Sequence, residues 1–305
     1  MPTQGHSRDV VVLSGKRTGF GTFGGSLKDF TATDLGAISS AAAIDAAGIS
    51  ADQVDHTFFG NALQTSADAI YLARHVALRA GVPQEKGALT VNRLCGSGFE
   101  AIVQGAKEII LGEADVCLTG GAESMSQAPH VVRGARFGSL RLGPAGKQFE
   151  DLLWECLLDT HCDLTMAQTA EELADRYEVS REEVDLVAVG SQQRAKAAWD
   201  AGYFEAEITP VTIKTRKGEV IYAADEHMRP ETSLEALGAL RPYFKKDGLV
   251  TAGNASGIGD GAASAVLASS EWAEANGVQP LGRIVSWGFV GVEPKVMGIG
   301  PAPAS

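Results

Sequence analysis

One strand–turn–helix–strand segment constrains the fold more than any other part of this sequence. Residues 88–92 (ALTVN) are predicted to form a strand, and 94–98 (LCGSG) a sharp turn. A helix over 98–112 and a second strand over 114–120 follow, with the helix's apolar residues spaced at i, i+3, i+4, i+7, i+10 and i+11 from Phe99. Because this order makes a βαβ unit, the sequence predicts an α/β fold with a largely parallel sheet.

Other segments of the first 120 residues follow the same pattern. Residues 9–13 (DVVVL) predict a buried strand because the run is short, apolar and β-branched. Thr33 and Asp34 are expected to open an alanine-rich helix that Gly48 ends. A strand is predicted over residues 55–60, and a helix over 68–80.

The chemical character of the chain changes after residue 121. Residues 124–149 contain no Asp or Glu but include four basic residues: Arg133, Arg136, Arg141 and Lys147. Two charged helices are predicted next, over about 167–177 and from Ser180, which opens a capping box with Glu183, to about 200. A hairpin follows around 215–222. These features indicate that residues 122–247 form an inserted, more polar domain.

Apolar alternation returns near the end of the chain. Residues 250–269 predict glycine-rich turns and an apolar strand that rejoins the first domain, and a final strand is expected from about residue 281.

The charge balance and the cysteines exclude several classes of protein. Lys and Arg number 26 and Asp and Glu 38, a net charge of −12, which argues against binding to nucleic acid or to an anionic membrane. The four cysteines are too few and irregular for a disulfide framework, and Cys156 and Cys162 are too widely spaced for a zinc knuckle. No metal is expected. The amino-terminal residues carry no signal-peptide pattern and no run is as long as a membrane span, so a cytoplasmic protein with reduced thiols is predicted.

Cys95 is the candidate nucleophile. A thiol reacts as its thiolate, which a helix N-terminus favours, and Cys95 lies at the predicted strand-to-helix turn. Gly96 and Gly98 leave room for a substrate near the backbone, whose N–H groups could stabilise an oxyanion. The alternative is a small apolar core residue, the common fate of a free cysteine. The residues alone leave both interpretations open.

Motifs along the whole chain resemble those of the thiolase family, in family order. The segment VNRLCGSGFEAI resembles the family's nucleophile segment. The other matching motifs are GGAESMSQAPH (120–130), MAQTAEELA (166–174), RKGEVIYAADEHMR (216–229), VTAGNASGIGDGAA (250–263) and PLGRIVSWGFVGVEPKVMGIGPAPA (280–304). Within the family, these motifs resemble those of the biosynthetic acetoacetyl-CoA thiolases and related β-ketothiolases.

The resemblance implies a layered αβαβα fold of two similar halves. The N-terminal half would comprise 1–121 and 248–270, and 122–247 would be a loop domain for CoA binding and oligomer contacts. Residues 271–305 would begin a truncated C-terminal half. Dimers or tetramers are the implied assembly, with a missing C-terminal segment or a companion chain as a further implied partner.

The resemblance also implies roles for individual residues. Cys95 would accept the acyl group, and Arg229 and Ser256 would contact the adenosine and pantetheine parts of CoA. Met166 would lie beside the acyl pocket. CoA thioesters would be the substrates, with no resident cofactor. His130, expected to be buried, and Cys117, expected in a strand, are interpreted as structural.

Two departures from the family pattern stand out. Thr165 and Ala167 occupy positions where many relatives have histidine and glycine, which bears on acyl preference. The family's Asn-Glu-Ala-Phe, Gly-His-Pro and Cys-x-Gly-x-Gly segments, with the base and the second cysteine, would lie beyond Ser305.

The implied function is thiolase-type acyl transfer in fatty acid metabolism, through a Cys95 thioester, to form or cleave a 3-ketoacyl-CoA. The alternatives are a non-catalytic CoA- or acyl-binding scaffold of the same fold and, among enzymes, a ketoacyl-synthase-like condensing enzyme. The basic residues in 131–147 are expected to attract CoA, with a subunit-contact loop as the alternative.

Overall fold

The computed structural model describes residues 8–138 and 149–305, which fall into two units. The first unit comprises residues up to 127, 204–227 and 258–286, and the second comprises 128–203, 228–257 and 287–305. Residues 204–227 therefore belong to the first unit, although they lie within the predicted insert. The predicted domain bounds stay a prediction.

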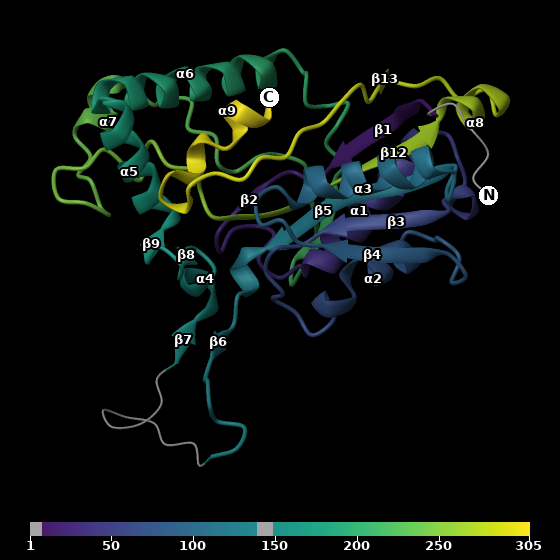
Figure 1. Cartoon of the computed structure of the whole chain (residues 1–305), viewed down its shortest axis with the longest axis horizontal. Helices are drawn as coiled ribbons and strands as arrows, with labels where there is room; N and C mark the ends of the chain where they lie inside the picture. Colours follow the sequence, from purple (N-terminus) through teal and green to yellow (C-terminus); the bar gives the residue numbers. More distant parts are fainter. Residues whose placement is uncertain (1–7, 139–148) are drawn as a thin grey trace. The chain divides into compact units, whose positions relative to one another are not determined.

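A mixed sheet forms the centre of the first unit (Figure 1). Its strand order is β13-β1-β12-β5-β3-β4, with β2 pairing with β12. The strands are β1 (Val10–Arg17), β2 (Gly21–Thr22), β3 (His56–Gly60), β4 (Gly87–Val91), β5 (Val116–Ser124), β12 (Gly259–Ser269) and β13 (Gly282–Arg283). β3 is parallel to both β4 and β5, whereas β12 runs antiparallel between β1 and β5. The predicted α/β class is confirmed.

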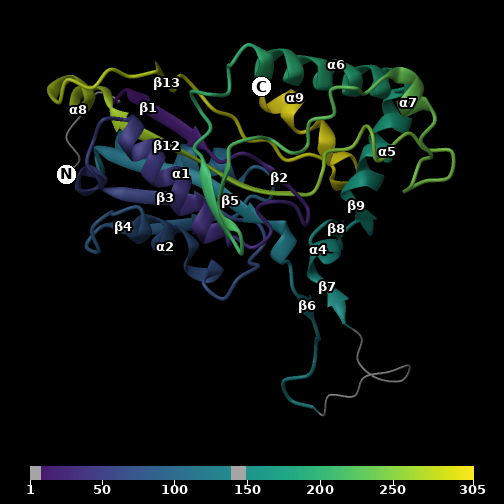
Figure 2. The ribbon, with the colours of Figure 1, turned by 180° about the vertical axis from the view of Figure 1, so that it is seen from behind.

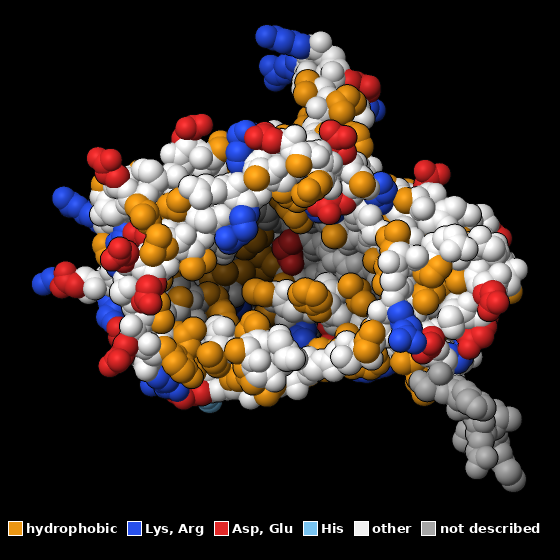
Figure 3. Space-filling view, turned by 90° about the horizontal axis from the view of Figure 1, so that it is seen from above, with side chains coloured by type: hydrophobic (Ala, Val, Ile, Leu, Met, Phe, Trp, Pro, Cys, Tyr) orange, Lys and Arg blue, Asp and Glu red, His pale blue; other side chains and the backbone are white. Residues whose placement is uncertain are grey.

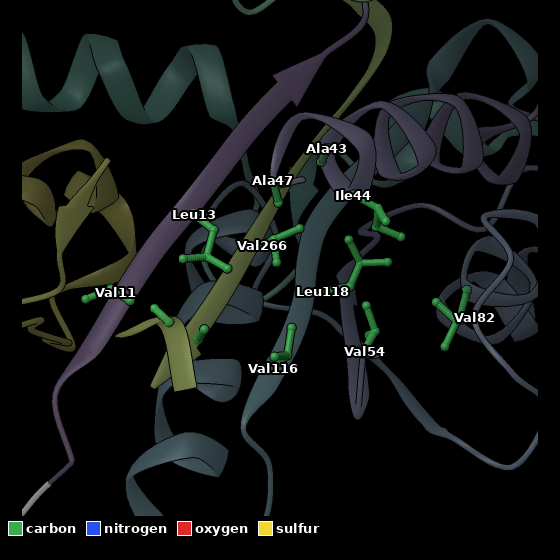
Figure 4. Packing of buried hydrophobic residues seen from close by; sticks show 13 residues of the cluster. Val11, Leu13, Ala43, Ile44, Ala47, Val54, Val82, Val116, Leu118 and Val266 are labelled. Atoms are coloured by element: carbon green, nitrogen blue, oxygen red, sulfur yellow. The ribbon is translucent and has the colours of Figure 1, made fainter. Parts of the chain in front are cut away.

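Helices cover both faces of this sheet. They are α1 (Ala32–Ala46), α2 (Leu72–Arg79), α3 (Ser97–Leu111) and α8 (Ser270–Ala275), with short 3₁₀ turns η1 (Ala51–Gln53), η2 (Ala69–Tyr71) and η3 (Met125–Gln127). Successive strand residues point to opposite faces, so Leu118 packs with Ala43 of α1 whereas Cys117 packs with Ala106 of α3. Figure 4 shows the α1 side of this core, and Figure 2 shows α1 in front of the sheet.

Two helices differ in detail from their sequence predictions. α1 begins at Ala32, just before the predicted start, because Thr31 rather than Thr33 is the N-cap and forms a capping box with Asp34. Phe99 of α3 is 77% exposed, although it was expected on the core face. The small residues Ala101 and Gly105 lie against the sheet instead, since a Cβ on Gly105 would be 2.7 Å from the Cγ2 of Thr119.

Residues 204–227 attach to β1 of the first unit. They carry the hairpin of β10 (Val211–Thr215) and β11 (Gly218–Tyr222), as predicted. The Arg17 guanidinium donates to both carboxylate oxygens of Asp225, at 2.7 and 2.9 Å, and to Glu207 at 2.8 Å. This fork geometry fixes the segment at both ends.

The second unit is built mainly from helices and short strand pairs. Its helices are α4 (Leu152–Glu155), α5 (Met166–Tyr177), α6 (Arg181–Asp200), α7 (Leu234–Gly238), η4 (Pro294–Ile299) and α9 (Pro301–Ala304). Its strands are β6 (His130–Val131), β7 (Glu150–Asp151), β8 (Leu158–Asp159) and β9 (Leu164–Thr165). The predicted capping box of Ser180 and Glu183 opens α6.

The predicted final strand is much shorter than expected. Of the predicted segment, Gly282–Arg283 alone forms a strand, β13, which pairs with β1, and from Trp287 the chain belongs to the second unit. Among the described residues, no helix is long and apolar enough to cross a membrane. Figure 3 shows acidic and basic side chains spread over the face that it presents, with hydrophobic side chains between them.

Candidate active site

Cys95 is exposed and lies in the tight turn between β4 and α3. The turn is closed by hydrogen bonds from the Gly96 N–H to the Arg93 carbonyl and from the Ser97 N–H to the Leu94 carbonyl, both at 3.0 Å. The Ser97 hydroxyl accepts from the Arg93 N–H at 2.9 Å and donates to the Leu94 carbonyl at 2.6 Å. One side chain thus ties the start of α3 to both ends of the turn before it. The core alternative for Cys95 does not fit its exposure.

Close backbone packing fixes the start of α3 against the sheet. A Cβ on Gly60, the last residue of β3, would lie 2.6 Å from the carbonyl carbon of Ser97. A Cβ on Gly121 of β5 would lie 3.5 Å from the Cα of Gly98. Only glycine at residue 60 permits this approach, so β3 sets how far the N-terminus of α3 sits from the sheet.

Polar side chains gather where the three parallel strands end. Gly60 pairs with Val91 of β4 and with Gly121 of β5. Asn61 and Asn92 come directly after these paired residues, and Glu123 comes two residues after Gly121. Asn61 is buried, and its amide donates to Glu123 Oε1 at 2.7 Å. The carboxyl ends of parallel strands are where α/β sheets bind ligands.

Two carboxylates of this region have shifted pKa values. Burial raises the pKa of Glu123, and the N–H groups of Ala62 and Leu63 only partly offset this effect. Burial also acts to raise the pKa of Glu100, but hydrogen bonds from Gln104 and Arg93 outweigh it and lower the pKa. Glu100 therefore stays ionised in the first turn of α3, paired with Arg93.

The other cysteines are placed differently. Cys117 is buried in β5, as predicted, and burial raises the pKa of its thiol. Cys156 is exposed and Cys162 half-buried, both in the second unit. Within residues 8–138 and 149–305, no group of three or more His, Cys, Asp or Glu side chains could hold a metal ion. The expectation that His130 is buried is wrong, because its position on the short strand β6 leaves its side chain 61% exposed.

The three candidate substrate contacts, Arg229, Ser256 and Met166, all lie in the second unit, whereas Cys95 lies in the first. Arg229 and Ser256 are exposed, and Met166 is half-buried at the first position of α5. The Thr165 that departs from the family pattern has a local role, since it caps α5 in a box with Gln168.

Helix α6 holds the segments that carry Arg229 and Ser256. The Gln192 Oε1 accepts from the Arg229 N–H at 2.7 Å, and the buried Asp185 accepts from the Asn254 amide at 2.9 Å. Asp185 and Gln192 are seven residues apart, which places them on one face of the helix, two turns from each other. The same face of α6 therefore positions both candidate contacts.

A buried carboxylate of α5 fixes the chain that leads to Ser256. Glu171 accepts from the N–H groups of Leu249, at 3.0 Å, and Val250, at 2.8 Å. A Cβ on Gly248 would meet this carboxylate at 2.5 Å, so the close approach depends on glycine.

The basic region is partly neutralised. The Arg133 guanidinium donates to Glu150 and lies 3.9 Å from Glu155. Arg136 is exposed. Arg141 and Lys147 lie outside the described residues.

Sequence reasoning missed Asn92, Glu123 and Gln192. Asn92 was a usable signal, because Asn side chains in turns commonly accept a hydrogen bond from the backbone N–H two residues on, here that of Leu94. Glu123 was visible only as part of a family motif. Gln192 gave no signal, because its role depends on a backbone group 37 residues away.

Comparisons with known proteins decide the family. The model of the family "Thiolase, N-terminal domain" matches residues 10–271. The chain belongs to the thiolase family. Among its relatives, the human mitochondrial 3-ketoacyl-CoA thiolase is 55% identical over 97% of this chain and 74% of the relative. The Beta-ketothiolase BktB of Cupriavidus necator is 48% identical over 98% of this chain and 75% of the relative.

Solved thiolase structures share the fold. The crystal structure of the human mitochondrial 3-ketoacyl-CoA thiolase matches with a TM-score of 0.94 at 55% identity, over 97% of this chain and 75% of that one. The structure of that enzyme in complex with CoA matches with a TM-score of 0.93 at 54% identity, over 97% and 74% of the two chains. The predicted thiolase-like fold and the predicted thiolase-type acyltransferase class are confirmed.

Thiolase relatives also overturn one prediction. Relatives from several mammals are mitochondrial enzymes, which contradicts the expectation of a cytoplasmic protein. That expectation used an absence of targeting pattern and the usual state of free thiols, neither of which distinguishes the cytosol from other reducing compartments.

Proposed function

We propose that this thiolase transfers an acyl group between CoA thioesters through a thioester on Cys95. The observation that carries the proposal is an exposed cysteine in the turn that enters α3, at the carboxyl ends of β3, β4 and β5. The relatives named as 3-ketoacyl-CoA thiolase and acetyl-CoA acetyltransferase support the substrate class.

The first half-reaction uses the Cys95 sulfur as the nucleophile. The thiolate attacks the carbonyl carbon of an acyl-CoA, a C–S bond to Cys95 forms, and the C–S bond to CoA breaks. The proton of the Cys95 thiol ends on the departing CoA sulfur, so free CoA leaves. Backbone N–H groups at the start of α3 suit the oxyanion of the tetrahedral intermediate, where the helix dipole also favours negative charge.

The second half-reaction forms the new carbon–carbon bond. A second acetyl-CoA loses an α-proton to a general base, and its carbon attacks the Cys95 thioester to give a 3-ketoacyl-CoA and the free thiol. Thiolysis is the reverse. We propose CoA thioesters as substrates, with no resident cofactor and no metal.

The second unit is proposed to hold the CoA moiety. Arg229 would contact its adenosine part and Ser256 its pantetheine part, with Met166 beside the acyl group. This assignment is supported by the hydrogen bonds between α6 and the segments that carry Arg229 and Ser256.

A homo-oligomer is the proposed assembly. Within the described part of the chain, β4 is one of the two edge strands of its sheet, and its Leu89 is 48% exposed. An edge strand presents unpaired backbone groups that a second copy can pair with. Light scattering of the purified protein would test this proposal, and a monomer at micromolar concentration would contradict it.

Intact-mass measurement after incubation with acetyl-CoA tests the acyl-transfer proposal. The wild type is expected to gain the mass of one acetyl group, and Cys95→Ser to gain none. Cys156→Ser is the matched control because Cys156 is also exposed, and it should acylate like the wild type. Acetylation that persists in Cys95→Ser would assign the nucleophile elsewhere.

A further inference from the structure

The residue before Cys95 has a strained backbone. Leu94 has a φ of +48°, in the left-handed region that is unfavourable for a leucine. Its side chain is 63% exposed, so core packing does not impose this conformation. The Leu94 N–H donates to the Asn92 Oδ1 at 2.8 Å. The Asn92 side chain therefore holds the backbone conformation that precedes the nucleophile.

Asn92 is held in turn by the segment that follows β3. Its Nδ2 donates to the Ala62 carbonyl at 3.1 Å. This second contact orients the amide of Asn92, because the NH₂ group that donates to Ala62 leaves the amide oxygen facing the Leu94 N–H.

The Ala62 segment is fixed by one carboxylate. The Ala62 N–H donates to Glu123 Oε2 and the Leu63 N–H to Oε1, both at 2.9 Å. The Asn61 amide donates to the same Oε1 at 2.7 Å. Glu123 thus uses both of its oxygens, and a continuous chain of hydrogen bonds runs from β5 through residues 61–63 to the turn of Cys95.

We infer that Asn92 and Glu123 are positioning residues for Cys95, acting through Ala62 and Leu94. The inference rests on the proposed role of Cys95 as acyl acceptor. Neither side chain needs to touch the substrate. Because the attacking atom must approach the carbonyl carbon in a defined geometry, a displacement of about 1 Å costs about a hundredfold in rate. Loss of the hydrogen-bonded chain should therefore slow acylation while leaving affinity for the acyl-CoA intact.

The first test is the rate of Cys95 acylation by acetyl-CoA in Asn92→Ala and Asn92→Asp. Asn92→Ala should lower the maximal rate about tenfold or more, with the half-saturating acetyl-CoA concentration within about twofold of wild type. Asn92→Asp keeps the acceptor for the Leu94 N–H but loses the donor to Ala62, so its rate should be intermediate. Asn276→Ala is the matched control, since Asn276 also donates to a backbone carbonyl in the first unit. It should acylate like the wild type.

A double-mutant cycle tests whether the two residues act in one chain. Glu123→Gln places an amide donor against one of the N–H groups of Ala62 and Leu63, so it should also slow acylation about tenfold. Combined with Asn92→Ala, it should slow acylation little further. A product of the two single effects, about a hundredfold, would overturn the inference.

Rescue at the strained position separates positioning from general damage. Asn takes the left-handed conformation more readily than Leu. Leu94→Asn should therefore recover part of the rate lost in Asn92→Ala. No recovery, together with a lowered free energy of unfolding for Asn92→Ala, would mean that Asn92 only stabilises the fold.

The proposed function and this inference fail in different ways. A wild type that is not acylated at Cys95 would refute the proposed function. The positioning chain would then be judged by amide hydrogen exchange of a peptide covering 93–97, which Asn92→Ala should accelerate at unchanged global stability. Unchanged exchange in Asn92→Ala would overturn the inference. If the wild type is acylated at Cys95, a normal acylation rate in Asn92→Ala would also overturn it.

Discussion

Gly60 lies so close to Ser97 that a side chain on Gly60 could not fit without moving α3, since its Cβ would be 2.6 Å from the Ser97 carbonyl carbon. Gly60→Ala should therefore push the N-terminus of α3 away from the sheet. We expect a loss of about 2 kcal/mol in the free energy of unfolding, typical of overpacking, and slower Cys95 acylation.

Gly15→Ala is the control for this prediction. A Cβ there meets no atom within 4 Å, and Gly15 also lies in a strand of the first unit. Urea unfolding should show a change within about 0.5 kcal/mol for this control. Equal stabilities of the two variants would mean that α3 adjusts freely.

Asp55 should make the protein sensitive to acid. Its burial acts to raise its pKa, but hydrogen bonds from Lys86 and from the N–H groups of Asp115 and Val116 outweigh this effect and lower the pKa. A folded-state pKa below the unfolded value of about 4 means that the stabilisation is present above that pH. It is lost as pH falls through the folded-state pKa.

Asp55→Asn should lower the free energy of unfolding by about 2 kcal/mol at pH 7, because the variant loses the hydrogen bonds to a charged carboxylate. The difference from wild type should shrink below about pH 4. Urea unfolding at several pH values measures it, with the exposed Asp52→Asn as control. A difference that stays constant from pH 7 to pH 3 would contradict the assignment.

Gln192→Ala should weaken CoA binding through Arg229. Loss of the acceptor for the Arg229 N–H frees the backbone of that residue, and one hydrogen bond of about 1 kcal/mol corresponds to about a fivefold change in Kd. Gln192→Glu keeps an acceptor and should bind CoA nearly normally. The exposed neighbour Gln193→Ala is the control, and calorimetric titration with CoA is the measurement. Unchanged affinity in Gln192→Ala would remove α6 from CoA binding.

Arg136→Glu should weaken CoA binding more at low salt than at high salt. Arg136 is exposed, whereas Arg133 is already paired with Glu150, so reversing Arg133 should have the smaller effect. Salt weakens attraction between exposed charges, and at 0.1 M it largely removes it beyond about 10 Å. Titrations at two ionic strengths would show it, and equal affinities at low salt would refute attraction of CoA by this region.

Local sequence patterns predicted the elements but not the contacts between them. The βαβ unit around Cys95 and the capping box of Ser180 follow from neighbouring residues, so the sequence indicated both. The exposure of Phe99 did not follow, because the fit of Gly105 against Thr119 decided which helix face is buried. Helix periodicity predicts an apolar stripe but not which part of it meets the sheet.

The candidate site also combines a local feature, which the sequence predicted, with contacts between distant segments, which it did not predict. Cys95 stood out because a turn between a strand and a helix is a local feature. The hydrogen bonds of Glu123 join segments about 60 residues apart, and that of Gln192 reaches 37 residues along the chain. Such pairings depend on the sheet order and on the packing of α6, which no single segment of sequence specifies.

Labelling with iodoacetamide, with and without acetyl-CoA, tests whether Cys95 is the acyl acceptor. Limited labelling at neutral pH, followed by peptide mass mapping, ranks the four thiols. We expect Cys95 to be labelled first, ahead of the exposed Cys156, and the buried Cys117 last. Prior incubation with acetyl-CoA should protect Cys95 alone. Preferential labelling of Cys156, with no protection of Cys95 by acetyl-CoA, would contradict the assignment of Cys95 as the acyl acceptor.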